Sequence, residues 1–134
     1  MGALSELYTR PANLFVARFI GTPEMNVIDA RAAQASRLAT ALPAEVASVG
    51  VRAEDLRLGG SGPSAQVDVV EHLGAEALVH LRVEMIELIA RVEAQAVPRT
   101  GERVQVAIDP ARLHCFAAGG ERVELPAPHA RALP

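Results

Sequence analysis

The sequence predicts a mainly β fold, a small barrel or sandwich of short antiparallel strands preceded by an N-terminal helical segment. Three observations lead to this prediction. Helical spacing of apolar residues is confined to residues 4–21 of the 134. Beyond residue 25, short runs rich in β-branched residues alternate with polar ones, which is the pattern of half-buried strands. Gly- and Pro-containing turns separate these runs at short intervals, as they do in small barrels and sandwiches.

The helical segment predicts a short first turn near Tyr8 and a second helix from Pro11. Pro suits the first helical position because its missing N–H has no intrahelical partner there. Gly21 is placed to end this helix, and Pro23 prevents it from resuming. At about 100° per residue one apolar stripe forms, and Ala17 lies off it. The stripe consists of Ala12, Phe15, Val16, Phe19 and Ile20.

The clearest strands form a predicted hairpin of residues 65–73 and 77–83, which turns at Gly74. Apolar and polar residues alternate on both sides of this Gly, and such alternation places one set of side chains on each face of a sheet. The Gly- and Pro-rich residues 59–63 form a turn before the hairpin. Further short strands are expected at residues 49–51, 86–92, 103–108, 113–116 and 122–125.

Residues 30–42 allow two interpretations. Their Ala content favours a helix by intrinsic propensity. Their neighbours favour a hairpin that turns near residues 34–36. Periodicity does not decide between the two, and both stay open at the level of the sequence.

Composition excludes several classes of function. The net charge is −3, and all 13 basic residues are Arg. Nucleic-acid binding needs clustered positive charge with stacking aromatic residues, and aromatic residues make up only 3% of the chain. A phosphate-binding loop of the Walker type needs a Lys, which this sequence lacks. The single Cys115 cannot form an internal disulfide, and no segment approaches the length of a membrane span.

No catalytic or metal-binding motif is found among the titratable residues. His114 and Cys115 are adjacent, so in a strand they point to opposite faces and cannot share one metal ion. Glu54 and Asp55 are adjacent carboxylates after a strand, where a solvated turn is the commoner role. We therefore expect no enzyme activity, no catalytic residue, no cofactor site and no metal site in this chain.

Several ordered stretches carry a resemblance to a known family. Residues 6–26 read ELYTRPANLFVARFIGTPEMN. This stretch closely resembles the end of the ATPase core in ATP-binding subunits of bacterial carbohydrate ABC importers of the maltose and glycerol-phosphate type. In that family the form E-L-Y-x-x-P-A-N-x-F-V-A-x-F-I-G-x-P-x-M-N leads into a C-terminal regulatory domain called TOBE, an oligonucleotide-binding-like (OB-like) β barrel.

The rest of the chain agrees with this family in order. Residues 49–56, VGVRAEDL, resemble its G-x-R-P-E-D/H-L turn, with Ala53 in place of the usual Pro. Residues 68–80, DVVEHLGAEALVH, resemble its V-x-x-V-E-x-L-G-x-E-x-x-x-H hairpin, and residues 101–116 resemble its closing strands. Residues 30–42 are shorter and richer in Ala than the family's first strands, so a trimmed barrel is expected there.

The resemblance implies a division of the chain and a set of partners. Residues 1–24 correspond to a helical segment left from the end of the ATPase core, residues 25–125 to the TOBE-like domain, and residues 126–134 to a flexible tail. ATP and Mg²⁺ belong to the ATPase core, which lies before this stretch in the family. The implied partners are that core, a second copy of the subunit, the membrane permease subunits indirectly, and a cytoplasmic regulatory protein. The implied location is peripheral, on the cytoplasmic face of the membrane.

The resemblance also suggests where contacts form. The surface around Arg52, Glu54 and Asp55 is a candidate contact for a regulator. The apolar stripe of the helical segment is a candidate contact for a second chain, which would give a homodimer. That stripe contributes Phe15, Val16, Phe19 and Ile20. An alternative is an oxyanion-binding barrel, as in related importers of molybdate, but the Ser-Ala-Arg-Asn-type stretch that holds the anion there does not occur here.

Overall fold

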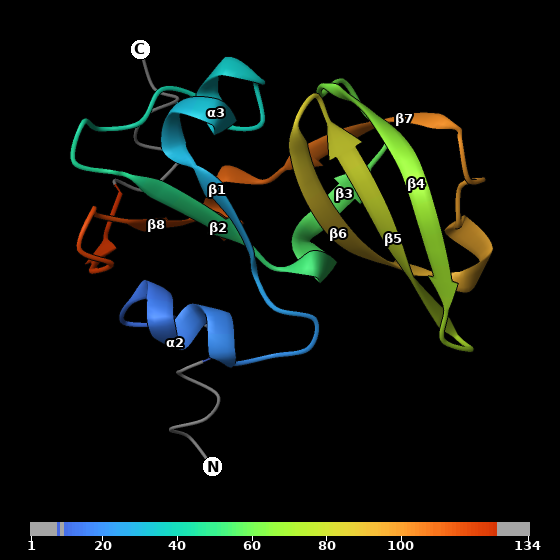
Figure 1. Ribbon diagram of the computed structural model, residues 1–134, viewed down its shortest axis with the longest axis horizontal. Coiled ribbons are helices and arrows are strands. Elements are labelled where there is room, and N and C mark those ends of the chain that lie inside the picture. The colour runs from blue at the N-terminus through green and yellow to red at the C-terminus, as the bar shows by residue number, and fades with distance from the viewer. Residues whose placement is uncertain (1–7, 9, 126–134) are drawn as a thin grey trace.

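Two antiparallel sheets form the fold in the computed structural model, which describes Tyr8 and residues 10–125 (Figure 1). The predicted first turn before Tyr8 and the predicted tail at residues 126–134 lie outside these described residues. The mainly β prediction is confirmed. Both sheets are open in the described part of the chain, so the arrangement is consistent with the OB-like sandwich rather than with a closed barrel.

The first sheet has the strand order β1-β2-β8-β9. It joins the two ends of the described chain, because β1 and β2 come early in the sequence and β8 and β9 come last (Figure 1). A short helix, α3, follows β1 directly. The strands are β1 (Asn26–Asp29), β2 (Ser48–Val51), β8 (His114–Phe116) and β9 (Arg122–Val123), and the helix is α3 (Ala30–Ala35).

The second sheet has the strand order β3-β7-β4-β5-β6. Its centre is the predicted hairpin, which is confirmed: β4 and β5 pair antiparallel from His72–Ala77 outward, with a bulge between Val67 and Val69. The strands are β3 (Leu56–Leu58), β4 (Ser64–His72), β5 (Glu76–Val83), β6 (Ile86–Glu93) and β7 (Arg103–Ile108). Three 3₁₀ turns accompany them: η1 (Ala53–Asp55), η2 (Ala94–Ala96) and η3 (Pro110–Arg112).

Helix α2 (Leu14–Phe19) corrects the predicted helix start. The Asn13 side chain accepts a hydrogen bond from the Val16 N–H at 2.9 Å and so caps the helix, which leaves Pro11 before the helix rather than at its first position. The prediction for Gly21 is confirmed, since its φ of 107° is the left-handed conformation that favours glycine and ends the helix.

The buried face of α2 also differs from the predicted stripe. Ala17, expected off the stripe, is fully buried with Met25 and Phe116, whereas Phe15 is 70% exposed. A methyl side chain at position 17 lets the helix backbone lie close to the Phe116 ring, which a larger residue would prevent. The helix therefore packs on the domain of its own chain, with Leu14 rather than Phe15 at the edge of this small cluster.

The open question at residues 30–42 is answered by α3. The Asp29 side chain accepts hydrogen bonds from the Arg31 and Ala32 N–H groups, both at 3.1 Å, and so begins the helix. The helix ends at Ala35, and Arg37, two residues further on, has a left-handed φ of 67°. An acidic residue just before an Ala-rich run was the local signal for this helix.

The core between the sheets is aliphatic, as the composition requires. Val79, Leu81 and Val83 are all buried, which confirms the face that alternation assigned to them. No helix in the described residues is long and apolar enough to cross a membrane.

Candidate functional site

The N-terminal segment is held on the first sheet by one buried arginine. Arg52 follows β2 directly and is only 2% exposed. Its neighbours come from the helical segment and from η1. We call this set of residues (Tyr8, Ala17, Ile20, Arg52 and Glu54) the Arg52 junction.

Three backbone carbonyls accept hydrogen bonds from the Arg52 guanidinium. Nη1 donates to the Ala17 carbonyl at 3.2 Å and to the Ile20 carbonyl at 2.5 Å, and Nη2 donates to the Tyr8 carbonyl at 3.2 Å. The carbonyls of Ala17 and Ile20 lie in the last turn of α2, where backbone oxygens lack intrahelical partners. Hydrogen bonds to a charged donor are about twice as strong as neutral ones, so this arginine fixes the end of α2.

Tyr8 contacts both Arg52 and Glu54 in the Arg52 junction. The Arg52 guanidinium carbon lies 4.2 Å from the centre of the Tyr8 ring, a cation–π contact. The Tyr8 hydroxyl donates a hydrogen bond to the Glu54 carboxylate. Burial, followed by this hydrogen bond, raises the pKa of Tyr8 to about 12, so the phenol keeps its proton at neutral pH.

The same burial acts on the charged groups beside Tyr8. It lowers the pKa of Arg52 from its ordinary value. It also raises the pKa of Asp55, and the negative charge of Glu54 adds to that rise. A cavity of about 230 Å³ lies beside these groups and extends to Arg112 and His114.

His114 is buried at the far side of this cavity. Arg122 Nη1 lies 3.1 Å from His114 Nδ1, and the Arg122 side chain also donates to the Glu124 carboxylate at 2.6 Å. Burial, reinforced by the positive charges of Arg122 and Arg52, lowers the pKa of His114 to about 4. His114 is therefore neutral at physiological pH, and its Nδ1 can accept the hydrogen bond from Arg122.

These contacts connect the end of α2 to the end of β2 through one side chain. Nη1 and Nη2 of Arg52 donate to protein carbonyls, while its buried Nε has no hydrogen-bond partner among the described residues. The described residues contain no group of three or more His, Cys, Asp or Glu side chains placed to hold a metal ion. What the arrangement can do is transmit displacement: moving α2 moves the end of β2, because both are bound to the same guanidinium.

The structure brings some predicted contact residues together and separates others. The expectation that Arg52 lies on an exposed contact surface is wrong, because its guanidinium is buried against α2. Glu54 is exposed and Asp55 is half-buried, so the surface at η1 is smaller than expected. Phe15 is exposed, while Val16 and Ile20 are half-buried; for Phe19 only the backbone in α2 is described.

Sequence reasoning missed two residues that the structure makes important. Tyr8 was noted only as part of a motif, although an aromatic beside a buried arginine is a recurring contact. Asn26 was not singled out, and it is buried with three hydrogen bonds. Neither residue has a local sequence signal. The hydrogen-bond partners of Asn26 lie 25 and 63 residues away in the sequence, and Glu54, the partner of Tyr8, lies 46 residues away.

Comparison with known proteins agrees with the resemblance found in the sequence. A family model described as a TOBE domain matches residues 49–116, which run from β2 to β8 and include Arg52 and His114. The sn-glycerol-3-phosphate import ATP-binding protein UgpC 3 of Agrobacterium fabrum is 37% identical over 138 residues, covering 92% of this chain and 39% of that protein.

Two further relatives give the same result. The alpha-glucoside transport ATP-binding protein AglK of Rhizobium meliloti is 38% identical over 143 residues, covering 90% of this chain and 40% of the relative. The UgpC protein of Cereibacter sphaeroides is 41% identical over 125 residues, covering 85% of this chain and 36% of that protein. The chain thus spans about two fifths of the length of these relatives. With the family model matching half of its residues, the chain belongs to the TOBE domain family.

Proposed function

We propose that this chain is the regulatory and dimerisation domain of the ATP-binding subunit of a bacterial ABC importer for a sugar or a related solute. The names of the relatives support this class of subunit, since they are import or transport ATP-binding proteins for glycerol phosphate and alpha-glucoside. The chain itself performs no catalysis in this proposal. ATP and Mg²⁺ act in the ATPase core, and the location is the cytoplasmic face of the membrane, beside the permease subunits.

The observation that carries the proposal is the Arg52 junction. The helical segment, residues 1–24 in the proposed division, resembles the end of an ATPase core, while residues 25–125 form the TOBE-like part. Arg52 binds three carbonyls of the first part from a strand end of the second. A core attached to the helical segment is then coupled to the β domain as one body, instead of swinging on a free linker.

Regulation follows from this coupling. A partner that binds the β domain shifts the core between two states only if it prefers one of them. A rigid junction makes such a preference possible, because the orientation of the β domain then depends on the state of the core. The exposed Glu54 and the half-buried Asp55 beside the junction are the proposed contact for a regulatory protein.

A second copy of the subunit is the proposed partner of the exposed side of α2. Phe15 is 70% exposed there, next to the half-buried Val16. A large aromatic side chain at a protein surface contributes strongly when an interface covers it. Replacing Phe15 by Ser in the assembled subunit should therefore weaken dimerisation without unfolding the domain.

A chimera tests the proposal. This chain replaces the matching part of the Agrobacterium fabrum relative in a strain that lacks it, and uptake of sn-glycerol-3-phosphate is measured. We expect the chimera to restore uptake, and the relative without that part to fail. Arg52→Met should lower uptake while ATP binding persists, whereas Arg18→Met, on the exposed side of α2, should leave uptake unchanged. Full uptake by the Arg52→Met chimera would contradict the coupling.

A further inference from the structure

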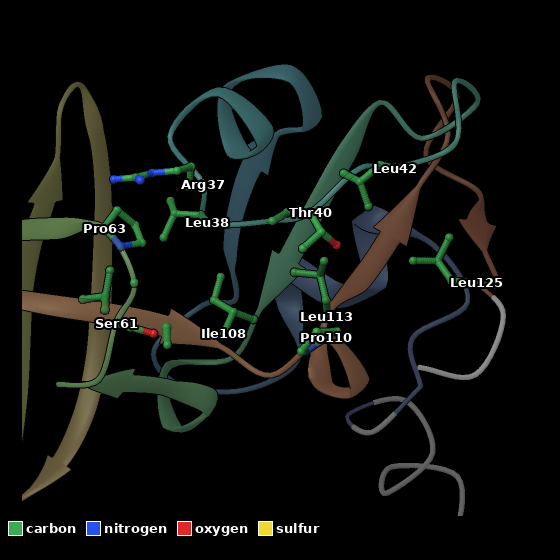
Figure 2. Close-up of a pocket in the computed structure, with 14 residues that line it drawn as sticks. Arg37, Leu38, Thr40, Leu42, Ser61, Pro63, Ile108, Pro110, Leu113 and Leu125 are labelled. Atoms are coloured by element: carbon green, nitrogen blue, oxygen red, sulfur yellow. The ribbon is translucent and has the colours of Figure 1, made fainter. Parts of the chain in front are cut away.

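A second pocket lies at the boundary between the two sheets and shares no lining residue with the cavity at the Arg52 junction (Figure 2). Its volume is about 180 Å³. Residues that flank the first sheet, Leu42, Leu113 and Leu125, form one part of the wall. Residues that flank or belong to the second sheet, Ser61 and Ile108, form another.

The two ends of this pocket differ in polarity. In Figure 2, Leu42, Leu113 and Leu125 gather at one end, with Pro110 and Ile108 leading away from them. At the other end, Arg37 lies above Pro63 and Ser61. The pocket is thus elongated, with aliphatic side chains and the hydroxyl groups of Thr40 and Ser61 along its length and a positive charge at one end.

The position of Arg37 is fixed by the turn that ends α3. Its backbone is left-handed, its N–H donates to the Gln34 carbonyl at 3.1 Å, and the Ala39 N–H donates to the Ala33 carbonyl at 3.0 Å. Within the part of the chain that the structure describes, its guanidinium has no ion pair and no hydrogen bond. The turn therefore presents an unused cation at the rim of a partly apolar pocket.

We propose that this pocket binds a small amphiphilic carboxylate, with its headgroup at Arg37 and its alkyl chain along Leu38 and Pro63 toward Ile108. An alkyl chain gains from leaving water for the aliphatic wall. A carboxylate matches the planar guanidinium, which can donate two hydrogen bonds to it. A bare inorganic anion is a poorer ligand, since it gains nothing from the aliphatic part of the wall.

Binding at this place has a structural consequence. The ligand contacts segments that flank both sheets, so it stabilises the native arrangement by an amount that grows with ligand concentration. The site is thus a means by which a small metabolite could act on the relative position of the two sheets, independently of any protein that contacts η1.

Titration of the intact ¹⁵N-labelled chain with hexanoate tests this proposal by NMR. We expect saturable shifts of the amide signals of Leu38, Ser61 and Ile108. Acetate carries the headgroup alone and 1-hexanol the alkyl chain alone, so each should bind at least about tenfold more weakly than hexanoate if both ends contribute. No shift at these amides, or equal affinities for hexanoate and 1-hexanol, would overturn the proposal.

Two variants separate the charge from the cavity. Arg37→Gln should weaken hexanoate binding about fivefold, the usual range for a partly exposed ion pair, and leave binding of 1-hexanol unchanged. Arg99→Gln, which removes an exposed arginine outside the pocket, is the matched control and should bind hexanoate as the parent does. Ala39→Leu adds volume inside the pocket and should abolish binding of both ligands. Parent-like hexanoate affinity in Arg37→Gln, or in Ala39→Leu with its thermal melt preserved, would contradict the assignment.

Discussion

The side chain of Asn26 hydrogen-bonds to the backbone of Ile89 at the unpaired edge of β6. Asn26 Oδ1 accepts a hydrogen bond from the Ile89 N–H at 2.7 Å, and Asn26 Nδ2 donates to the Ile89 carbonyl at 2.9 Å. Nδ2 also donates to the Val51 carbonyl at 3.1 Å. Ile89 lies in β6, at the end of the second sheet, and Asn26 begins β1, at the end of the first. One carboxamide thus satisfies backbone groups of an edge strand and joins the two sheets.

Asn26→Ala should lower the free energy of unfolding by about 2–4 kcal/mol, because it removes three hydrogen bonds to buried or half-buried backbone groups of Ile89 and Val51. Urea denaturation followed by circular dichroism measures this loss as a lower midpoint with an unchanged slope. Gln105→Ala, at an exposed position of β7, is the control and should stay within about 0.5 kcal/mol of the parent. Equal midpoints for the two variants would show that the Asn26 contacts do not hold the sheets together.

Gly62→Ala should destabilise the domain more than Gly60→Ala. A Cβ on Gly62 would lie 1.7 Å from the Val106 carbonyl oxygen, which belongs to the backbone of β7 and cannot rotate away. Gly60 has open space around it, and only its φ of 87° opposes a side chain, at a cost of about 1 kcal/mol. Thermal melts of both variants give the order, and a Gly62→Ala melt at or above that of Gly60→Ala would contradict the packing of this loop on β7.

His114 should make the domain less stable as the pH falls from about 6.5 to about 4. Its folded pKa lies near 4, below the ordinary value of 6.5, so the unfolded chain takes up the proton first over this range. The free energy of unfolding falls by about 3 kcal/mol in total; the loss is complete below pH 4 and absent above pH 6.5. Arg122, Arg52 and Glu124 are the charged groups that act on His114.

The His114→Gln variant isolates this effect. Urea midpoints of the parent and the variant are compared from pH 7 to pH 4, and their difference removes the contribution of the carboxylates, which titrate in both. We expect the parent to lose more stability than the variant across this range. Parallel curves would mean that His114 is not titrating from a depressed pKa.

How much the sequence predicts depends on the distance over which each interaction acts. The β4–β5 hairpin was predictable because alternation and Gly74 act within a few residues. The face of α2 was not, because the Asn13 cap and the contact of Ala17 with Phe116 decide which residues are buried. The Arg52 junction joins residues 32 to 44 positions apart, and no local pattern of charge or hydrophobicity reports such contacts.

Arg52→Met should loosen the end of α2 while the sheets stay folded. Three carbonyls then lose a charged donor, and the Ile20 amide, which donates to the Val16 carbonyl, should exchange its hydrogen about tenfold faster. Amides in β4 and β5 should exchange as in the parent. The Arg18→Met variant is the control on the exposed side of the helix. Unchanged exchange at Ile20 in Arg52→Met would show that the arginine does not hold this segment.

The central claim is that this TOBE domain acts through its contacts and not on nucleotide. Its sequence has no Lys for a phosphate-binding loop, and the two terminal nitrogens of Arg52 donate to backbone carbonyls. Calorimetric titration of the intact chain with ATP and Mg²⁺ tests this most directly. The account predicts no heat of binding at millimolar nucleotide, and a dissociation constant in the micromolar range would contradict it.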